Sequence, residues 1–83
     1  MTNWKEENNK LTKTFLFKNF GDAIAWMVKA SFEIEKLNHH PEWSNVYNKV
    51  HVSLTTHDKG NTITEKDRKL ATLIEGFAAL IKR

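Results

Sequence analysis

"NFGDAIAWMVKASFEIEKL", residues 19–37, decides the fold, because it has the periodicity of a long amphipathic helix between strand-like segments. Asn19 with Asp22 offers a helix cap, and Gly21 marks a change of chain direction. At about 100° per residue its apolar side chains cover roughly two-thirds of the circumference, more than contact with one sheet requires. We therefore expect two contacts, the chain's own sheet and a partner subunit's helix. A charge on the outward-facing side, for example at Ala30, is expected to split that assembly.

The segment before this helix predicts a β-hairpin. "WKEE" at residues 4–7 can begin a first strand, and the polar "NNK" at 8–10 reads as a turn. "LTKTFLF" at 11–17 alternates as a second strand, with one side formed by Leu11, Lys13, Phe15 and Phe17.

The segment after the helix predicts a second hairpin and a second helix. "WSNVYNKVHVSLTTH" at 43–57 is β-branched and aromatic, with a tight turn or bulge at 48–49. Val50, Val52 and Leu54 then point to one side of the strand, and His51, Ser53, Thr55 and, if the strand lasts, His57 point to the other. Thr64 with Asp67 matches a helix-opening capping pattern, followed by a stripe of Leu70, Leu73, Ile74, Phe77, Leu80 and Ile81.

This order of strand, strand, helix, strand, strand, helix predicts an α+β fold, a four-stranded antiparallel sheet with helices packed on one face. The 83 residues form a single domain, residues 1–83, and contain no cysteine, so neither disulfides nor a structural zinc site stabilise it. Self-association is the remaining device for a domain this small.

Composition also indicates which classes of partner the protein is not expected to bind. The net charge of +3 comes from 13 basic and 10 acidic side chains spread along the chain, which disfavours direct nucleic-acid binding. No apolar run approaches the ~20 residues that span a membrane, and "MTNWKEENNK" lacks the apolar core of a signal peptide. We expect a cytoplasmic protein without membrane contact.

Three histidines stand at positions suited to acid–base chemistry. In "NHHP", Pro41 stiffens the turn and pushes His40 towards an extended backbone, so the rings of His39 and His40 diverge. Two imidazoles held apart suit a site that protonates one ligand atom and deprotonates another. The alternative is a solvated surface turn. A zinc or iron site is disfavoured, because the histidines lack i,i+4 spacing and no acidic fourth ligand is plainly arranged.

Other candidates have ordinary structural explanations beside functional ones. His57 follows a strand where a loop begins, which suits a functional side chain as well as an exposed strand end. Asp67 fits a capping-box carboxylate. Glu35 near a helix end is less well explained by a local role. His51 is expected to decorate the exposed side of the sheet, and Trp43 to be a core or lid residue.

The text "IEKLNHHPEWSNVYNKVHVSLTTH", followed by "TEKD", resembles the pterin-4a-carbinolamine dehydratases. The resemblance extends back through "FLFKNFGDAIAWM" to Trp4, nearly the whole chain. It implies an α+β domain that forms dimers by joining sheets edge to edge, and tetramers through a bundle of long helices. It also implies dehydration of 4a-hydroxytetrahydrobiopterin to quinonoid dihydropterin and water, which recycles tetrahydropterin without metal or organic cofactor.

Carried onto this chain, the resemblance implies a catalytic set of His39, His40 and His57. His40 and His57 are expected to be the acid–base pair, with His39 orienting the pterin. The implied substrate-binding residues are Glu35, Pro41, Trp43, Thr56, Asp58 and Asp67.

Two departures from the family and two alternative functions stay open. Only three residues precede Trp4, where members usually carry another helix, and the loop at 58–64 looks a residue longer than in the animal proteins. The chain could instead be a non-enzymatic protein-binding or dimerisation cofactor, the role of an animal member that serves a homeodomain transcription factor. It could also act on another pterin.

Overall fold

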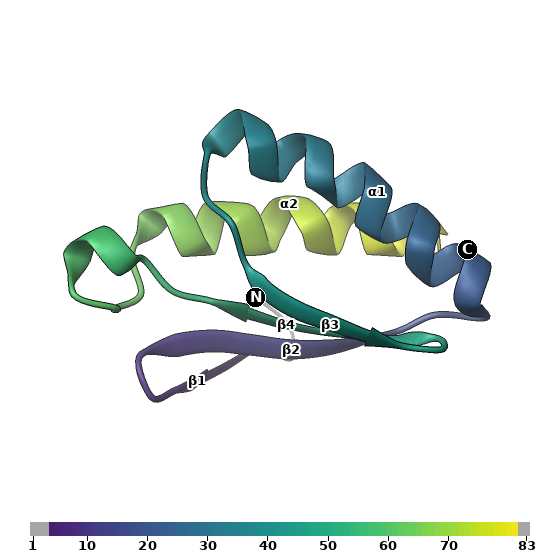
Figure 1. Cartoon of the computed structure of the whole chain (residues 1–83), viewed down its shortest axis with the longest axis horizontal. Helices are drawn as coiled ribbons and strands as arrows, with labels where there is room; N and C mark the ends of the chain where they lie inside the picture. The colour runs from purple at the N-terminus through teal and green to yellow at the C-terminus, as the bar shows by residue number, and fades with distance from the viewer. Residues whose placement is uncertain (1–3, 82–83) are drawn as a thin grey trace.

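Two helices lie on one face of a four-stranded antiparallel sheet in the computed structural model, which describes residues 4–81 (Figure 1). The elements are β1 (Lys5–Glu7), β2 (Lys10–Leu16), α1 (Phe20–Leu37), β3 (Glu42–Val46), β4 (Lys49–Leu54) and α2 (Glu65–Ile81), with a 3₁₀ turn at His57–Lys59. The predicted α+β fold and order of elements are confirmed.

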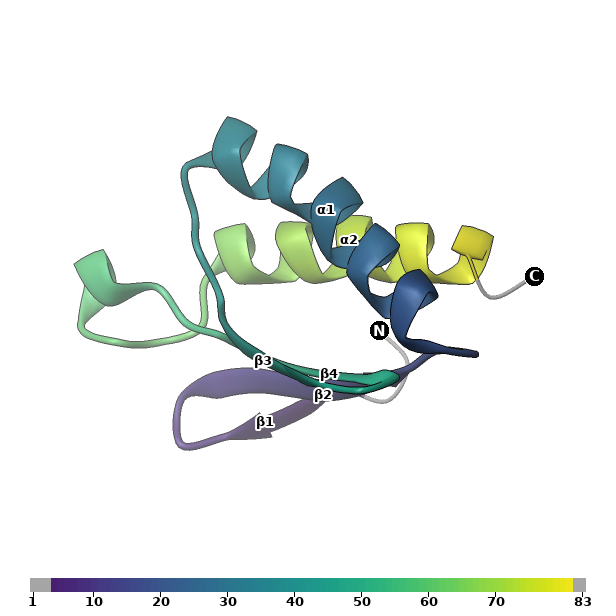
Figure 2. The ribbon, with the colours of Figure 1, turned by 45° about the vertical axis from the view of Figure 1, so that its right-hand side comes forward.

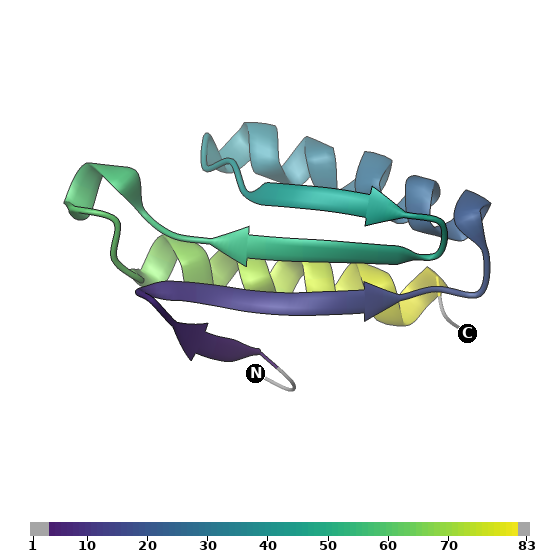
Figure 3. The ribbon, with the colours of Figure 1, turned by 60° about the horizontal axis from the view of Figure 1, so that its bottom comes forward.

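The strands are arranged in the order β1-β2-β4-β3, so the two hairpins meet along β2 and β4 (Figure 3). Leu11 pairs with Leu54 and Phe15 with Val50, which puts all four on the helix-facing side. Asn8 and Asn9 turn the first hairpin with positive φ, a conformation that asparagine tolerates. In the second hairpin the turn lies at 47–48, one residue earlier than predicted, because Lys49 already pairs in β4.

The helix α1 begins as the sequence predicts. The Asn19 side chain accepts a hydrogen bond from the Asp22 backbone N–H at 2.8 Å, which satisfies one of the free donors of the first turn. At the other end, Asn38 has φ of 49° and closes the helix by donating its N–H to Glu35 and Ile34 carbonyls. The helix therefore stops just before His39.

One narrow stripe of α1 supplies its buried contacts, namely Ala23, Trp26, Ala30 and Ile34. Trp26 is fully buried, and its indole Nε1 donates to the Ile74 carbonyl of α2 at 2.8 Å. Figures 2 and 3 together show α1 inclined to α2 on the same side of the sheet. The choice of Ala30 as an outward-facing residue was wrong, because Ala30 has no exposed surface within the chain itself.

The broad apolar arc of α1 nonetheless leaves a row of apolar side chains in solvent, comprising Phe20, Ile24, Val28 and Phe32. They occupy the side of α1 opposite its buried stripe, one helical turn apart. On α2 the buried stripe includes Leu70, Ile74 and Ala78, whereas Leu80 is exposed despite fitting the predicted stripe. None of the helices formed by residues 4–81 is long and apolar enough to cross a membrane.

Candidate active site

The three predicted catalytic histidines line one cavity at the end of the sheet where β4 leaves and β3 begins. The cavity has a volume of about 310 Å³, and its walls come from the loop between α1 and β3, the 3₁₀ turn after β4 and the start of α2. Its lining residues are Asn38, His39, His40, Pro41, Glu42, Thr56, His57, Asp58 and Lys66. His39 and His57, which are 18 positions apart along the chain, therefore line the same pocket.

Asp67 is the fully buried anchor of this pocket. Its Oδ2 accepts hydrogen bonds from the Thr64 backbone N–H and the Thr56 hydroxyl, each at 2.8 Å. Its Oδ1 accepts from Nε2 of His39 at 2.5 Å. The capping role and the site role proposed for Asp67 are thus compatible, because one carboxylate caps α2 while it holds the histidine.

His39 is itself almost fully buried, at 8% exposure. Because a carboxylate only accepts hydrogen bonds, the Nε2 that faces Asp67 carries a proton. The bond joins the loop after α1 to the first turn of α2, 28 residues away in sequence. His39 is therefore held in one orientation, which suits the predicted role of orienting a ligand rather than moving in the reaction.

His40 is exposed and pairs with a different carboxylate. Its Nε2 lies 2.9 Å from Oε1 of Glu35, in the last turn of α1. Both side chains are largely in solvent, so this pair contributes little to stability. Glu35 does not line the cavity, and its contact with the cavity's residues is this hydrogen bond to His40.

His57 begins the 3₁₀ turn, so the strand does not last to it and it shares no strand face with His51. Its Nδ1 lies 2.6 Å from Oδ1 of Asn61, a residue with φ of 57°. Thr56 beside it is buried, and its hydroxyl bonds to Asp67 and Thr64. The backbone before His57 is therefore tied to the same anchor as His39.

Comparisons with known proteins identify the family of this chain. The family model for pterin 4 alpha carbinolamine dehydratase matches residues 1–77. The chain belongs to this family.

A relative from Opitutus terrae, provisionally named a pterin-4-alpha-carbinolamine dehydratase, is 51% identical over 72 residues, 87% of this chain and 74% of that protein. A Brucella melitensis structure described as a transcriptional coactivator/pterin dehydratase superposes with a TM-score of 0.90 at 40% identity, covering 94% of this chain and 84% of that one. A pterin dehydratase-like protein described as a RuBisCO assembly factor in the alpha-carboxysome has a TM-score of 0.73 at 20% identity, covering 90% and 86%. At that identity it supports the fold alone.

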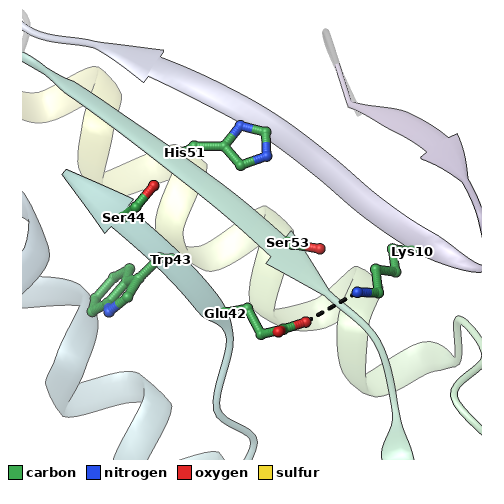
Figure 4. Close-up of a pocket in the computed structure, with 6 residues that line it drawn as sticks. All are labelled: Lys10, Glu42, Trp43, Ser44, His51 and Ser53. Carbon is green, nitrogen blue, oxygen red and sulfur yellow. Dashed lines mark hydrogen bonds and ion pairs between the residues drawn. The ribbon is translucent and has the colours of Figure 1, made fainter. Parts of the chain in front are cut away.

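Trp43 and His51 lie away from the histidine cavity. Trp43 pairs with Val52 in the sheet, and its ring lies 6.0 Å from that of Trp26 in the core. It also borders a shallow recess on the open sheet face, shared with Ser44, His51 and other residues drawn in Figure 4. His51 is exposed there, as predicted, with Nδ1 2.9 Å from the Thr14 hydroxyl.

Four residues of the candidate site were not singled out from the sequence. Asn38, Glu42 and Lys66 line the cavity, and Asn61 bonds to His57. Asn38 had a local signal, since an asparagine just after a helix favours the left-handed cap. Lys66 sits within "TEKD" at the start of α2, where a lysine carries no signal of its own. The residues before Trp4, where the family's additional helix is expected, lie outside the described part of the chain.

Proposed function

We propose that the chain is a 4a-hydroxytetrahydrobiopterin dehydratase, which removes water from pterin-4a-carbinolamine by histidine acid–base catalysis. The observation that carries this proposal is that His39, His40 and His57 line one cavity. One ring nitrogen of each histidine also lies within hydrogen-bond distance of a side-chain oxygen from another residue. A volume of about 310 Å³ is at the lower end of small-ligand sites and suits a bicyclic ring. The family and its provisionally named relatives support the same reaction.

The chemistry needs one proton donor and one proton acceptor. A donor protonates the departing 4a-hydroxyl, and an acceptor takes the proton of the neighbouring ring nitrogen. His40 and His57 are the proposed pair, and His39, fixed by Asp67, orients the pterin. Proton transfer alone completes this dehydration, so the proposed mechanism uses no metal or organic cofactor.

The remaining proposed site residues divide by what they contact. Pro41, Thr56 and Asp58 border the cavity, where they can contact the ligand or shape its entrance. Glu35 and Asp67 act through His40 and His39. Trp43 borders a different recess and packs on Trp26, so its proposed contribution is to support the loop that precedes it rather than to stack on the pterin.

We also propose that the protein works as a dimer or a tetramer built on the exposed row of α1. Phe32 at 63% exposure and Val28 at 52% are large apolar side chains in solvent. Burying a fully exposed side chain of this kind contributes ~1.5–3 kcal/mol, so burying the exposed part of each contributes a share of that, and large contiguous apolar patches are uncommon on monomers. Two alternative functions stay open. The first is a non-enzymatic role as a protein-binding cofactor, which would use this same face of α1. The second is action on another pterin.

The deciding experiment is a dehydration assay with 4a-hydroxytetrahydrobiopterin generated by an aromatic amino-acid hydroxylase and followed by absorbance. The purified protein should raise the rate well above that of buffer, and a stable pterin analogue should inhibit it. His51→Ala, in the exposed sheet, is the matched control and should keep full activity. A rate equal to that of buffer would reject the enzyme and favour the binding role.

A further inference from the structure

The three histidines of the cavity differ in the partner that holds them. His39 and His40 each face a carboxylate, whereas His57 faces the uncharged side-chain amide of Asn61. The Nδ1 to Oδ1 distance of 2.6 Å indicates a firm hydrogen bond. Asn61 itself does not line the cavity, so it acts on the site only through His57.

The loop that carries Asn61 is closed by the backbone. The Thr56 N–H donates to the Thr62 carbonyl at 2.9 Å, and the Thr62 N–H returns a hydrogen bond to Thr56 at 3.4 Å. Gly60 and Asn61 both adopt positive φ, at 76° and 57°, to complete the turn. Glycine and asparagine are the residues that adopt this conformation most readily. The turn therefore sets the Asn61 amide opposite the His57 ring.

A carbonyl oxygen accepts hydrogen bonds and donates none, so the His57 Nδ1 that faces Oδ1 carries the proton. In the neutral ring this leaves the lone pair on Nε2. A free neutral imidazole favours the opposite tautomer, so the Asn61 contact changes which nitrogen can accept a proton. An amide, unlike a carboxylate, adds no negative charge that would favour the imidazolium.

We infer that Asn61 is a positioning residue that holds His57 as its Nδ1–H tautomer, so that Nε2 is the base of the proposed reaction. His40, beside the Glu35 carboxylate, then supplies the acid. In the dehydration the C4a–O bond breaks, and the hydroxyl leaves as water with a proton from His40. The neighbouring ring N–H gives its proton to His57, and the electron pair of that N–H bond forms the C=N double bond. This assignment rests on the proposed function.

Three variants test the assignment. Asn61→Gly removes the amide while it keeps the positive φ accessible, and Asn61→Asp restores an acceptor with a negative charge. Lys59→Ala is the matched control, since it alters an exposed residue of the same turn. The tautomer of His57 is read from long-range ¹H–¹⁵N correlation spectra of ¹⁵N-histidine-labelled protein, at about pH 8.5 where a free imidazole is neutral.

Wild-type protein and Lys59→Ala should show His57 as the Nδ1–H form, and Asn61→Gly should convert it largely to the Nε2–H form. The kcat of Asn61→Gly should fall about tenfold with KM nearly unchanged, less than the 10²-fold or more expected for losing the base. Asn61→Asp should keep the tautomer and move the low-pH limb of kcat/KM to higher pH, because the added charge favours protonated His57.

An Nε2–H tautomer in the wild-type protein, or unchanged tautomer and kcat in Asn61→Gly, would overturn the positioning role of Asn61. Inactive wild-type protein whose tautomer still responds to Asn61→Gly would instead reject the proposed reaction and support the positioning role. The two failures are therefore distinguishable.

Discussion

Replacing Asp67 with alanine should both destabilise the fold and release the side chains that Asp67 holds in the candidate site. The change removes the acceptor of three hydrogen bonds, from His39, Thr56 and the Thr64 backbone. The Thr56 hydroxyl can still bond to Thr64, since the two oxygens lie 2.6 Å apart. The His39 Nε2 donor then remains buried without a partner, and the half-buried Thr64 backbone N–H loses its acceptor.

An unpaired buried donor costs about 1–3 kcal/mol, and a lost helix cap costs about 0.5–2 kcal/mol. The expected loss for Asp67→Ala is therefore about 2–5 kcal/mol of unfolding free energy, a large part of the ~5–15 kcal/mol typical of a domain. Asp67→Asn keeps the shape, and its amide NH₂ can face His39 if that ring changes tautomer. It should cost less stability, yet still reduce activity, because the other ring nitrogen of His39, Nδ1, would then carry the proton in place of a lone pair.

Urea denaturation followed by circular dichroism measures the stability of each variant, and the dehydration assay measures its activity. Asp22→Asn is the control, because Asp22 is a partly exposed carboxylate in the first turn of α1 and its loss should change stability by about 1 kcal/mol or less. An Asp67→Ala variant as stable as Asp22→Asn would refute the anchoring role. Full activity in Asp67→Asn would refute the dependence of His39 on the carboxylate.

Two further predictions concern stability and assembly. Burial raises the pKa of Glu75, but the hydrogen bond and charge of Lys13 and the Trp4 hydrogen bond outweigh it, so the pKa lies below its usual 4.5. Glu75 thus stabilises the fold above that value and ceases to do so as pH falls through the lower folded pKa. In the Glu75→Gln variant the unfolding free energy should fall less steeply as pH falls from about 5 to 3. A slope equal to that of the wild-type protein would contradict this. Phe32→Glu should lower the sedimentation coefficient without unfolding the chain, whereas Ala30→Glu should unfold it. A wild-type monomer at micromolar concentration would reject the proposed assembly.

The order of the elements was predictable from the sequence because it depends on short-range pattern. Alternation in residues 11–17 and helical periodicity in 19–37 are local properties, and the Asn19 cap formed as its sequence indicates. The end of β4 was less predictable. The strand stops at Leu54 because Thr56 pairs across a loop with Thr62, a contact that no periodicity signals.

The direction in which the α1 residues face was not predictable from the helix alone. Ala30 and Phe32 both lie in the apolar arc, but the position of α2 and the sheet buries the first and exposes the second. The hydrogen-bond partners of the histidines were not predictable from the sequence for the same reason. The family resemblance named His39 and Asp67 separately, whereas the bond between them depends on how α1 and α2 are placed. Asn61 carried no pattern of its own.

The most direct test of the account compares two histidines that lie in different parts of the fold. His57 lines the cavity, and His51 is exposed on the open sheet face outside it. The turnover number for dehydration of 4a-hydroxytetrahydrobiopterin should fall on the order of 10²-fold or more in His57→Ala, as expected for losing a positioned base. In His51→Ala it should stay close to that of the wild-type protein. Equal losses in the two variants, or full activity in His57→Ala, would contradict the assignment of the histidine cavity as the catalytic site.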